Sequence, residues 1–185
     1  MMQIRFVRHA HTNRDVELDR ERPLTEAGER AATSLGGRWR AERFEPDIVV
    51  CSTAQRARHT ALLVCPPSTV RVLQEEFYFG TDPSWGPPIE AAFHEYGNAP
   101  LERYLTSPAR DALVRYGDAA CATIVTLAKQ RSPIRRMAVF GHAVFLPAIA
   151  LRLLLTRGEP APERPEILKQ PLEECGVIDL RLTSL

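Results

Sequence analysis

The 185-residue sequence has little lysine, little net charge and no closely spaced cysteine pair. Lysine occurs only at Lys129 and Lys169, so 22 of the 24 basic residues are arginines. Acidic residues number 23, which leaves a formal charge of +1. Such a balance gives no electrostatic reason to expect nucleic acid or a membrane surface as partner. The four cysteines form no CxxC pair, so no zinc site or redox motif is indicated, and we expect reduced core residues.

Long uninterrupted apolar runs are also missing. The apolar run at the N-terminus is too short and too interrupted for a signal peptide. The most apolar stretch, Met137–Leu155, contains Gly141, Pro147 and Arg152, and we expect a buried strand followed by a helix there rather than a membrane span. These absences predict a cytoplasmic protein.

The excess of arginine over lysine has two explanations. Genome composition alone could produce it. Alternatively, some of the arginines bind anions, because a planar guanidinium holds phosphate in a bidentate fork and an ammonium does not.

The length and the ordinary composition, 44% hydrophobic and 25% charged, predict one domain over residues 1–185. Apolar runs alternate with helical periodicity. The expected strands are Ile4–Val7, Ile48–Cys51, Val70–Leu73, Met137–Phe140 and Val177–Leu182. The expected helices cover about residues 25–42, 53–64, 110–129 and 143–155. This alternation predicts an α/β fold, a three-layer α/β/α sandwich around a mostly parallel central sheet.

Two stretches rich in proline, Asp82–Pro88 and Gly158–Pro171, are expected to be loops. Residues 77–100 contain aromatics and prolines without a clean period. We therefore expect a variable, substrate-facing excursion at about residues 77–108. Its aromatic residues could either pack or contact a substrate.

Two histidines directly follow expected strands. Arg8 and His9 follow the first strand, His142 follows the fourth, and Arg56 lies one turn into the helix after the second. Because the carboxyl ends of strands in an open α/β sheet line the ligand crevice, all four side chains should face one cavity.

This concentration of positive charge predicts an anionic ligand, since unpaired buried charge is costly. Phosphate fits best, because a guanidinium binds its oxygens in pairs and helix N-termini add donors. One imidazole would attack phosphorus, while the other, expected to be cationic in His142, would neutralise the phosphoryl oxygens.

At these positions the chain resembles the histidine phosphatase superfamily, whose fold is phosphoglycerate-mutase-like. Phe6–Thr12 is similar to its Arg-His-Gly-x-Thr signature, with Ala10 in place of the glycine. Pro23–Gly28 matches its Pro-Leu-Thr-x-x-Gly segment, and Cys51–Ala61 matches its Ser-x-x-x-Arg-Ala-x-x-Thr-Ala helix, with threonine in place of the proline that usually follows the serine. The short length is similar to the small phosphohistidine-phosphatase branch.

The resemblance implies that His9 becomes phosphorylated and that water then hydrolyses the phosphohistidine. It implies that Arg8, Arg56 and His142 bind the phosphoryl group and that Thr12 supports the site. No metal or other cofactor is implied.

The proton donor to the leaving group is ambiguous. The mutase branch places a glutamate four residues before a glycine after the third strand, and Glu76 with Gly80 fits that spacing. Glu75 fits another register. In the phosphohistidine-phosphatase branch this acid is often absent.

The sequence therefore predicts a phosphatase that acts on a small phosphorylated metabolite or on a phosphohistidine protein. A phosphoglycerate-mutase-type phosphotransferase and a catalytically idle phosphate-binding module remain the alternatives. The oligomeric state is not predicted.

Overall fold

The computed structural model describes residues 1–13, 15–74, 77–78, 82–131, 133–157 and 164–183. Its centre is a five-stranded sheet in the order β3-β2-β4-β1-β5. Strands β1 to β4 are mutually parallel, and β5 pairs antiparallel with β1. The strands are β1 (Met2–Arg8), β2 (Ile48–Ser52), β3 (Val70–Gln74), β4 (Arg136–Gly141) and β5 (Val177–Leu182). The helices are η1 (Asp19–Glu21), α1 (Glu26–Ala41), α2 (Gln55–Val64), α3 (Gly86–Tyr96), α4 (Leu101–Leu105), α5 (Arg110–Gln130), α6 (Phe145–Arg157) and α7 (Arg164–Lys169).

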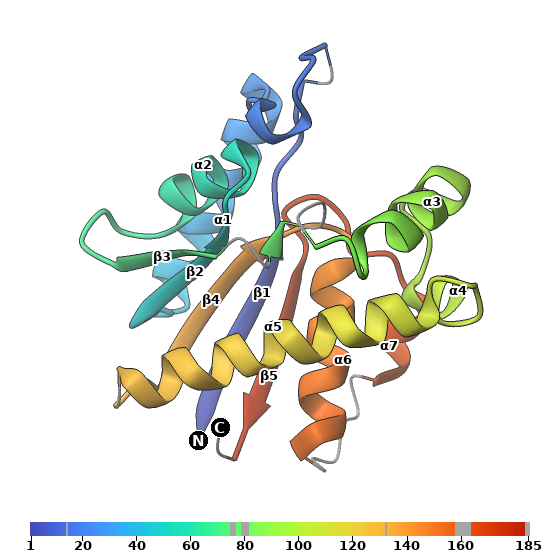
Figure 1. Cartoon of the computed structure of the whole chain (residues 1–185). Helices are drawn as coiled ribbons and strands as arrows, with labels where there is room; N and C mark the ends of the chain where they lie inside the picture. Colours follow the sequence, from blue (N-terminus) through green and yellow to red (C-terminus); the bar gives the residue numbers. More distant parts are fainter. Residues whose placement is uncertain (14, 75–76, 79–81, 132, 158–163, 184–185) are drawn as a thin grey trace.

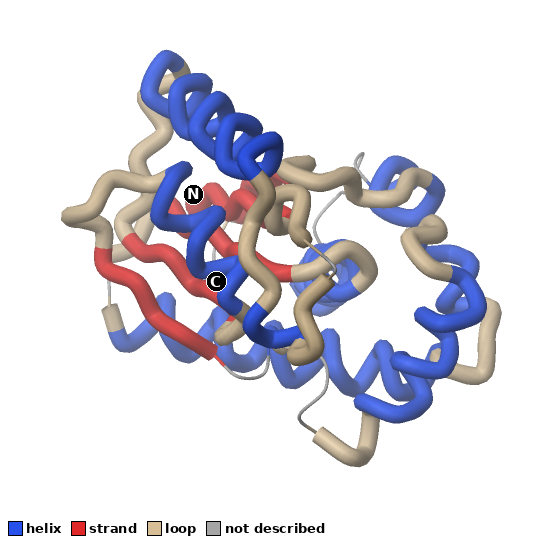
Figure 2. Tube along the Cα trace, turned by 90° about the horizontal axis from the view of Figure 1, so that it is seen from above, coloured by secondary structure: helices blue, strands red, loops and turns tan. Residues whose placement is uncertain are grey.

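Helices cover both faces of the sheet (Figures 1 and 2). On one face Ile4 and Phe6 of β1 pack in a core that includes residues of α5 and α6. On the other face Val7 and Val49 pack with the apolar residues of α1 and α2. Successive strand side chains point to opposite faces, so the apolar run of each central strand supplies both cores. The predicted α/β sandwich with a mostly parallel sheet is confirmed.

Local signals explain where the first helix starts. The Thr25 side chain accepts a hydrogen bond from the Gly28 N–H at 3.1 Å and so caps α1. Gly28 itself has no room for a side chain, because a Cβ there would lie 2.3 Å from the His11 carbonyl oxygen. The Pro-Leu-Thr segment therefore fixes the start of α1 against the loop that follows β1.

The two expected loops are partly helical. Helix α3 begins at Gly86 and carries Pro87 and Pro88 in its first turn, and α7 carries Pro165 in its own. Proline suits that position because the first N–H groups of a helix have no intrahelical partner and the ring presets φ. The loop prediction was wrong for residues 86–88 and 164–169, since these prolines start helices.

The excursion after β3 contributes α3 and α4, which lie together beyond the sheet on the side of α6 and α7 (Figure 1). Within the described part of the chain, no helix is long and apolar enough to cross a membrane.

Candidate active site

The carboxyl ends of the two central strands place the histidines side by side. In the parallel register of β1 and β4, Arg8 lies opposite Gly141, and the His9 N–H donates to the Gly141 carbonyl at 2.9 Å. The ring centroids of His9 and His142 are 5.3 Å apart. The parallel pairing itself therefore sets the distance between the two imidazoles.

Each ring nitrogen of His142 has a partner. The guanidinium of Arg56 donates to Nδ1 at 3.3 Å, and because a guanidinium can only donate, Nδ1 is the unprotonated nitrogen. Nε2 then carries the hydrogen and donates to the Ser52 hydroxyl at 2.9 Å. Ser52 also accepts from the Ala54 N–H at 3.2 Å, which ties the ring to the start of α2.

The tautomer of His9 follows from its backbone contact. Nδ1 lies 2.8 Å from the Ala10 carbonyl oxygen, which can only accept, so Nδ1 carries the hydrogen. The lone pair is then on Nε2, the nitrogen required of a nucleophile. Ala10 is fully buried and its N–H donates to the Thr60 hydroxyl at 3.0 Å. The loop that orients His9 is thus anchored to α2.

Arg56 is buried and held by Asp19 of η1. Its guanidinium donates to the Asp19 carbonyl at 2.5 Å and to the Asp19 carboxylate at 2.9 Å. Asp19 also pairs with Arg22 at 3.0 Å and accepts from the Tyr78 hydroxyl at 3.1 Å. The Tyr78 ring lies edge-on to His142, with centroids 5.9 Å apart. Asp19 therefore joins the loop before α1 to both Arg56 and the excursion.

Arg8 turns toward the segment that precedes β5. It donates to the Leu172 carbonyl at 2.8 Å and forms an ion pair with Glu174 at 3.8 Å. Thr12 is buried and forms an isolated bridge with Leu24. The site thus draws on residues from both ends of the chain.

These groups enclose one cavity of about 180 Å³. The expected residues Arg8, His9, Thr12, Arg56 and His142 all line it. Its lining further includes Asp19, Arg22, Phe93, Ala143, Phe145 and Glu174. Glu75 and Glu76 lie outside the described residues. Among the described residues no group of three histidine, cysteine or acidic side chains is placed to hold a metal ion.

Burial and neighbouring charge make both imidazoles weak bases. Burial, Arg56 and Arg8 lower the pKa of His9 from 6.5 to about 3, while the hydrogen bond to Ala10 opposes this. Burial, Arg56, His9 and Arg8 hold the pKa of His142 well below 6.5. His142 is therefore neutral in this arrangement, and the cationic form expected of it beside a phosphoryl group stays a prediction. Because both rings are neutral, the positive charge beside them comes from the arginines, and this charge favours the binding of an anion.

The lowered pKa values predict that acid destabilises the fold. The unfolded chain binds protons at both histidines below about pH 6.5, whereas the folded protein does not, so stability is full above that pH and falls as the pH decreases toward 3. We expect the free energy of unfolding to fall by about 2 to 4 kcal/mol between pH 7 and pH 5. The two histidines should contribute about equally, because His9, with its pKa of about 3, and His142, with its pKa well below 6.5, both stay neutral in the folded protein at pH 5.

Urea unfolding at the two pH values measures this difference. His142→Gln should reduce it by about half. The control, His59→Ala, changes a histidine with 36% of its side chain exposed and should leave the difference unchanged. Equal unfolding free energies at pH 5 and pH 7 for the wild type would contradict the lowered pKa values.

A comparison with known protein families identifies the family to which this chain belongs. The sequence model of the histidine phosphatase superfamily, branch 1, matches residues 4–177. The chain belongs to this superfamily. The predicted resemblance is thus confirmed over nearly the whole chain, despite Ala10 and Thr53 at positions where the family pattern has glycine and proline. No curated protein matches the sequence.

Solved structures of similar fold carry names of phosphatases. A protein from Nakamurella multipartitia assigned as phosphohistidine phosphatase SixA has 24% identity and a TM-score of 0.61, over 96% of this chain and 84% of that one. Phosphoserine phosphatase from Entamoeba histolytica has 16% identity and a TM-score of 0.64, over 97% and 90%. Mycobacterial glucosyl-3-phosphoglycerate phosphatase has 14% identity and a TM-score of 0.67, over 100% and 93%. At these identities the likeness shows the shared fold.

Several residues that line the cavity of this histidine phosphatase superfamily member were not predicted from the sequence. Arg22 directly precedes the Pro-Leu-Thr segment, so its place could have been found from the motif. Asp19 and Glu174 lie in segments with no recognisable pattern, whereas Phe93 is one of the aromatic residues of the excursion that were expected either to pack or to contact a substrate. Their positions depend on how η1, α3 and the segment before β5 close over the strand ends.

Proposed function

We propose that this protein is a phosphatase that forms a covalent phosphohistidine at His9. The observation that supports it most is the tautomer of His9, because the hydrogen bond from Nδ1 to Ala10 leaves the Nε2 lone pair for attack. Membership of the histidine phosphatase superfamily supports the same chemistry. The substrate would be a small phosphomonoester or a phosphohistidine protein.

In the first step Nε2 of His9 attacks phosphorus, an N–P bond forms, and the bond from phosphorus to the leaving group breaks with its electron pair. Arg8 and Arg56 would neutralise the phosphoryl oxygens, and Thr12 would support the loop. A phosphoryl dianion beside His142 would favour protonation of its ring, because an opposite charge raises the pKa of an imidazole. Glu76 or Glu75 remains the proposed proton donor to an alkoxide.

In the second step water attacks phosphorus and the N–P bond breaks, which releases phosphate and restores neutral His9. The cavity favours this outcome over transfer back to the substrate. Phe93, which lines it, is 40% exposed, so solvent reaches the rim. A mutase must instead keep water out while the phosphoryl group is held.

Incubation with phenyl phosphate and, separately, with 3-phosphoglycerate tests this proposal. We expect phosphate release from phenyl phosphate, and from 3-phosphoglycerate either phosphate release or no reaction. Phosphate can be followed by a colorimetric assay and 2-phosphoglycerate by an enzyme-coupled assay in the same samples. Isomerisation faster than phosphate release would favour the mutase. No turnover of either compound would favour the idle phosphate-binding module.

A further inference from the structure

The described aromatic residues of the excursion differ in what surrounds them. Phe77 is fully buried, and Trp85 packs against the core with its ring 6.0 Å from that of Tyr116. Tyr78 is engaged with Asp19. Phe93 of α3 differs, because it lines the cavity of the histidines and is its most exposed apolar residue. It is the aromatic ring of α3 that a leaving group at the cavity rim would meet.

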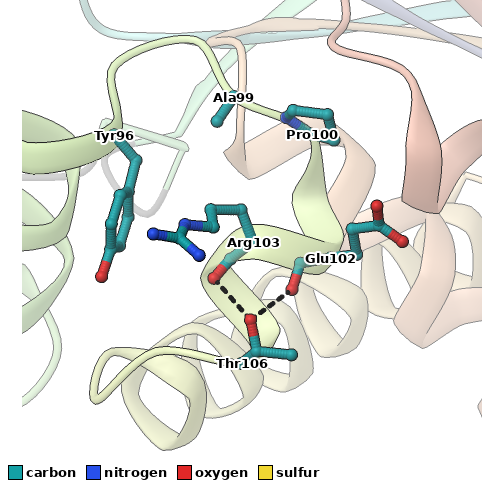
Figure 3. Close-up of a pocket in the computed structure, with 6 residues that line it drawn as sticks. All are labelled: Tyr96, Ala99, Pro100, Glu102, Arg103 and Thr106. Atoms are coloured by element: carbon teal, nitrogen blue, oxygen red, sulfur yellow. Dashed lines mark hydrogen bonds between the residues drawn. The ribbon is translucent and has the colours of Figure 1, made fainter.

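Tyr96, three residues further along α3, faces a different hollow. Its ring lies beside Arg103 of α4, whose guanidinium is 4.7 Å from the ring centroid (Figure 3). Thr106 closes that hollow by donating to the carbonyls of its own helix. Helix α3 thus turns Phe93 toward the catalytic histidines and Tyr96 away from them.

The charge of the cavity limits which leaving groups it can hold. Its described lining carries three arginines, Arg8, Arg22 and Arg56, against the two carboxylates Asp19 and Glu174, which leaves a net charge of +1 with both histidines neutral. A phosphoryl dianion already reverses this charge, and protonation of His142 beside it brings the sum only to zero. A further carboxylate on the leaving group would then face Glu174 and add negative charge that nothing in the described lining offsets, which disfavours it.

The same two carboxylates are already engaged by cationic side chains. Asp19 accepts from Arg56, Arg22 and Tyr78, and Glu174 pairs with Arg8. Within the described lining neither acid is without a cationic partner, so a phenolate, which departs without a proton, or an imidazole, which solvent can protonate, makes the least demand on it. Both are flat aromatic rings.

We propose that Phe93 selects the leaving group, and that the site takes phosphorylated compounds whose leaving group is a flat aromatic ring without negative charge. This inference rests on the proposed function and deepens it. Phe93 on one side and the buried ring of Phe145, which packs against Tyr116 at 4.9 Å, would form the apolar wall beyond the phosphoryl site. Aromatic contacts of this kind stabilise a bound ring beyond the area they bury.

Four small substrates test the leaving-group preference of the wild type. Phenyl phosphate and phosphorylimidazole present the two kinds of ring, 4-carboxyphenyl phosphate adds a carboxylate to the first, and acetyl phosphate has no ring. We expect kcat/KM for 4-carboxyphenyl phosphate to be at least about fivefold below that for phenyl phosphate, although its phenolate is the better leaving group. Comparison of kcat/KM for phenyl phosphate and for phosphorylimidazole shows whether the site prefers a phenol ring or an imidazole ring as the leaving group.

Two variants of neighbouring residues test Phe93 itself. Phe93→Ala should lower kcat/KM for phenyl phosphate or phosphorylimidazole about tenfold. For acetyl phosphate, kcat/KM should change by less than about twofold. The matched control is His94→Ala, which removes the next ring of α3, 80% exposed and paired with Glu90. His94→Ala should leave kcat/KM for all four substrates unchanged.

The outcomes separate this inference from the proposed function. If the wild type turns over none of the four compounds, the proposed function fails. If it turns them over, but Phe93→Ala affects phenyl and acetyl phosphate equally or affects neither, Phe93 does not select the leaving group. If kcat/KM for 4-carboxyphenyl phosphate equals or exceeds that for phenyl phosphate, the cavity does not disfavour a negatively charged leaving group.

Discussion

The His9→Ala variant is expected to hydrolyse phenyl phosphate at least about 10³-fold more slowly than the wild type, because it loses the atom that we propose accepts the phosphoryl group. Removal of a nucleophile leaves only the binding and charge stabilisation supplied by the arginines. The fold should survive, since His9 lies at the end of β1 and is only half-buried. Circular dichroism and thermal unfolding check the fold while phosphate release measures the rate.

A neighbouring histidine provides the control. His11 is exposed, lies within 3.0 Å of the Thr25 hydroxyl, and is absent from the cavity lining. His11→Ala should therefore retain nearly full turnover. An acid-labile, alkali-stable phosphoryl group should be trapped on the wild type and on His11→Ala but not on His9→Ala. Residual activity of His9→Ala above about a tenth of the wild-type kcat would exclude covalent catalysis at His9.

The fold could be predicted because its central strands carry unmistakable patterns. Ile48–Cys51 and Met137–Phe140 are continuous apolar runs, and the structure buries them on both faces. The excursion could not be predicted in the same way. Pro87 and Pro88 read as loop residues, yet the first turn of α3 accommodates both because its N–H groups need no helical partner. Proline marks a boundary but does not say on which side the helix lies.

The site divides along a similar line. Arg8, His9, Arg56 and His142 follow or begin regular elements, so the sheet-edge rule brings them together. Asp19 and Glu174 could not be placed, because they reach the site from irregular segments whose course depends on the finished fold. The neutral state of His142 in this arrangement could not be predicted for a related reason. It results from burial and from the neighbouring charge of Arg56, and neither has a characteristic spacing in the sequence.

The Arg56→Lys variant should lose about 10²-fold or more in kcat/KM on phenyl phosphate, although it keeps the positive charge. Arg56 donates through two nitrogens to Asp19 and to Nδ1 of His142 at once, and a single ammonium cannot reproduce this planar set of donors. Loss of one preorganised donor to a developing oxyanion commonly costs 10² to 10³ in rate. Both the phosphoryl contact and the orientation of His142 should therefore weaken together.

The matched control lies two residues further along α2. Arg58 is exposed and lines a different hollow, so Arg58→Lys should leave kcat/KM within about twofold of the wild type. Thermal unfolding shows whether Arg56→Lys is folded, and inorganic phosphate should protect the wild type and Arg58→Lys against unfolding but protect Arg56→Lys less. A folded Arg56→Lys variant with wild-type turnover and undiminished protection by phosphate would mean that Arg56 serves only to hold Asp19. The charge-assisted contacts of Asp19 would then be structural, and the anion would be held by the other arginines of the lining, Arg8 and Arg22.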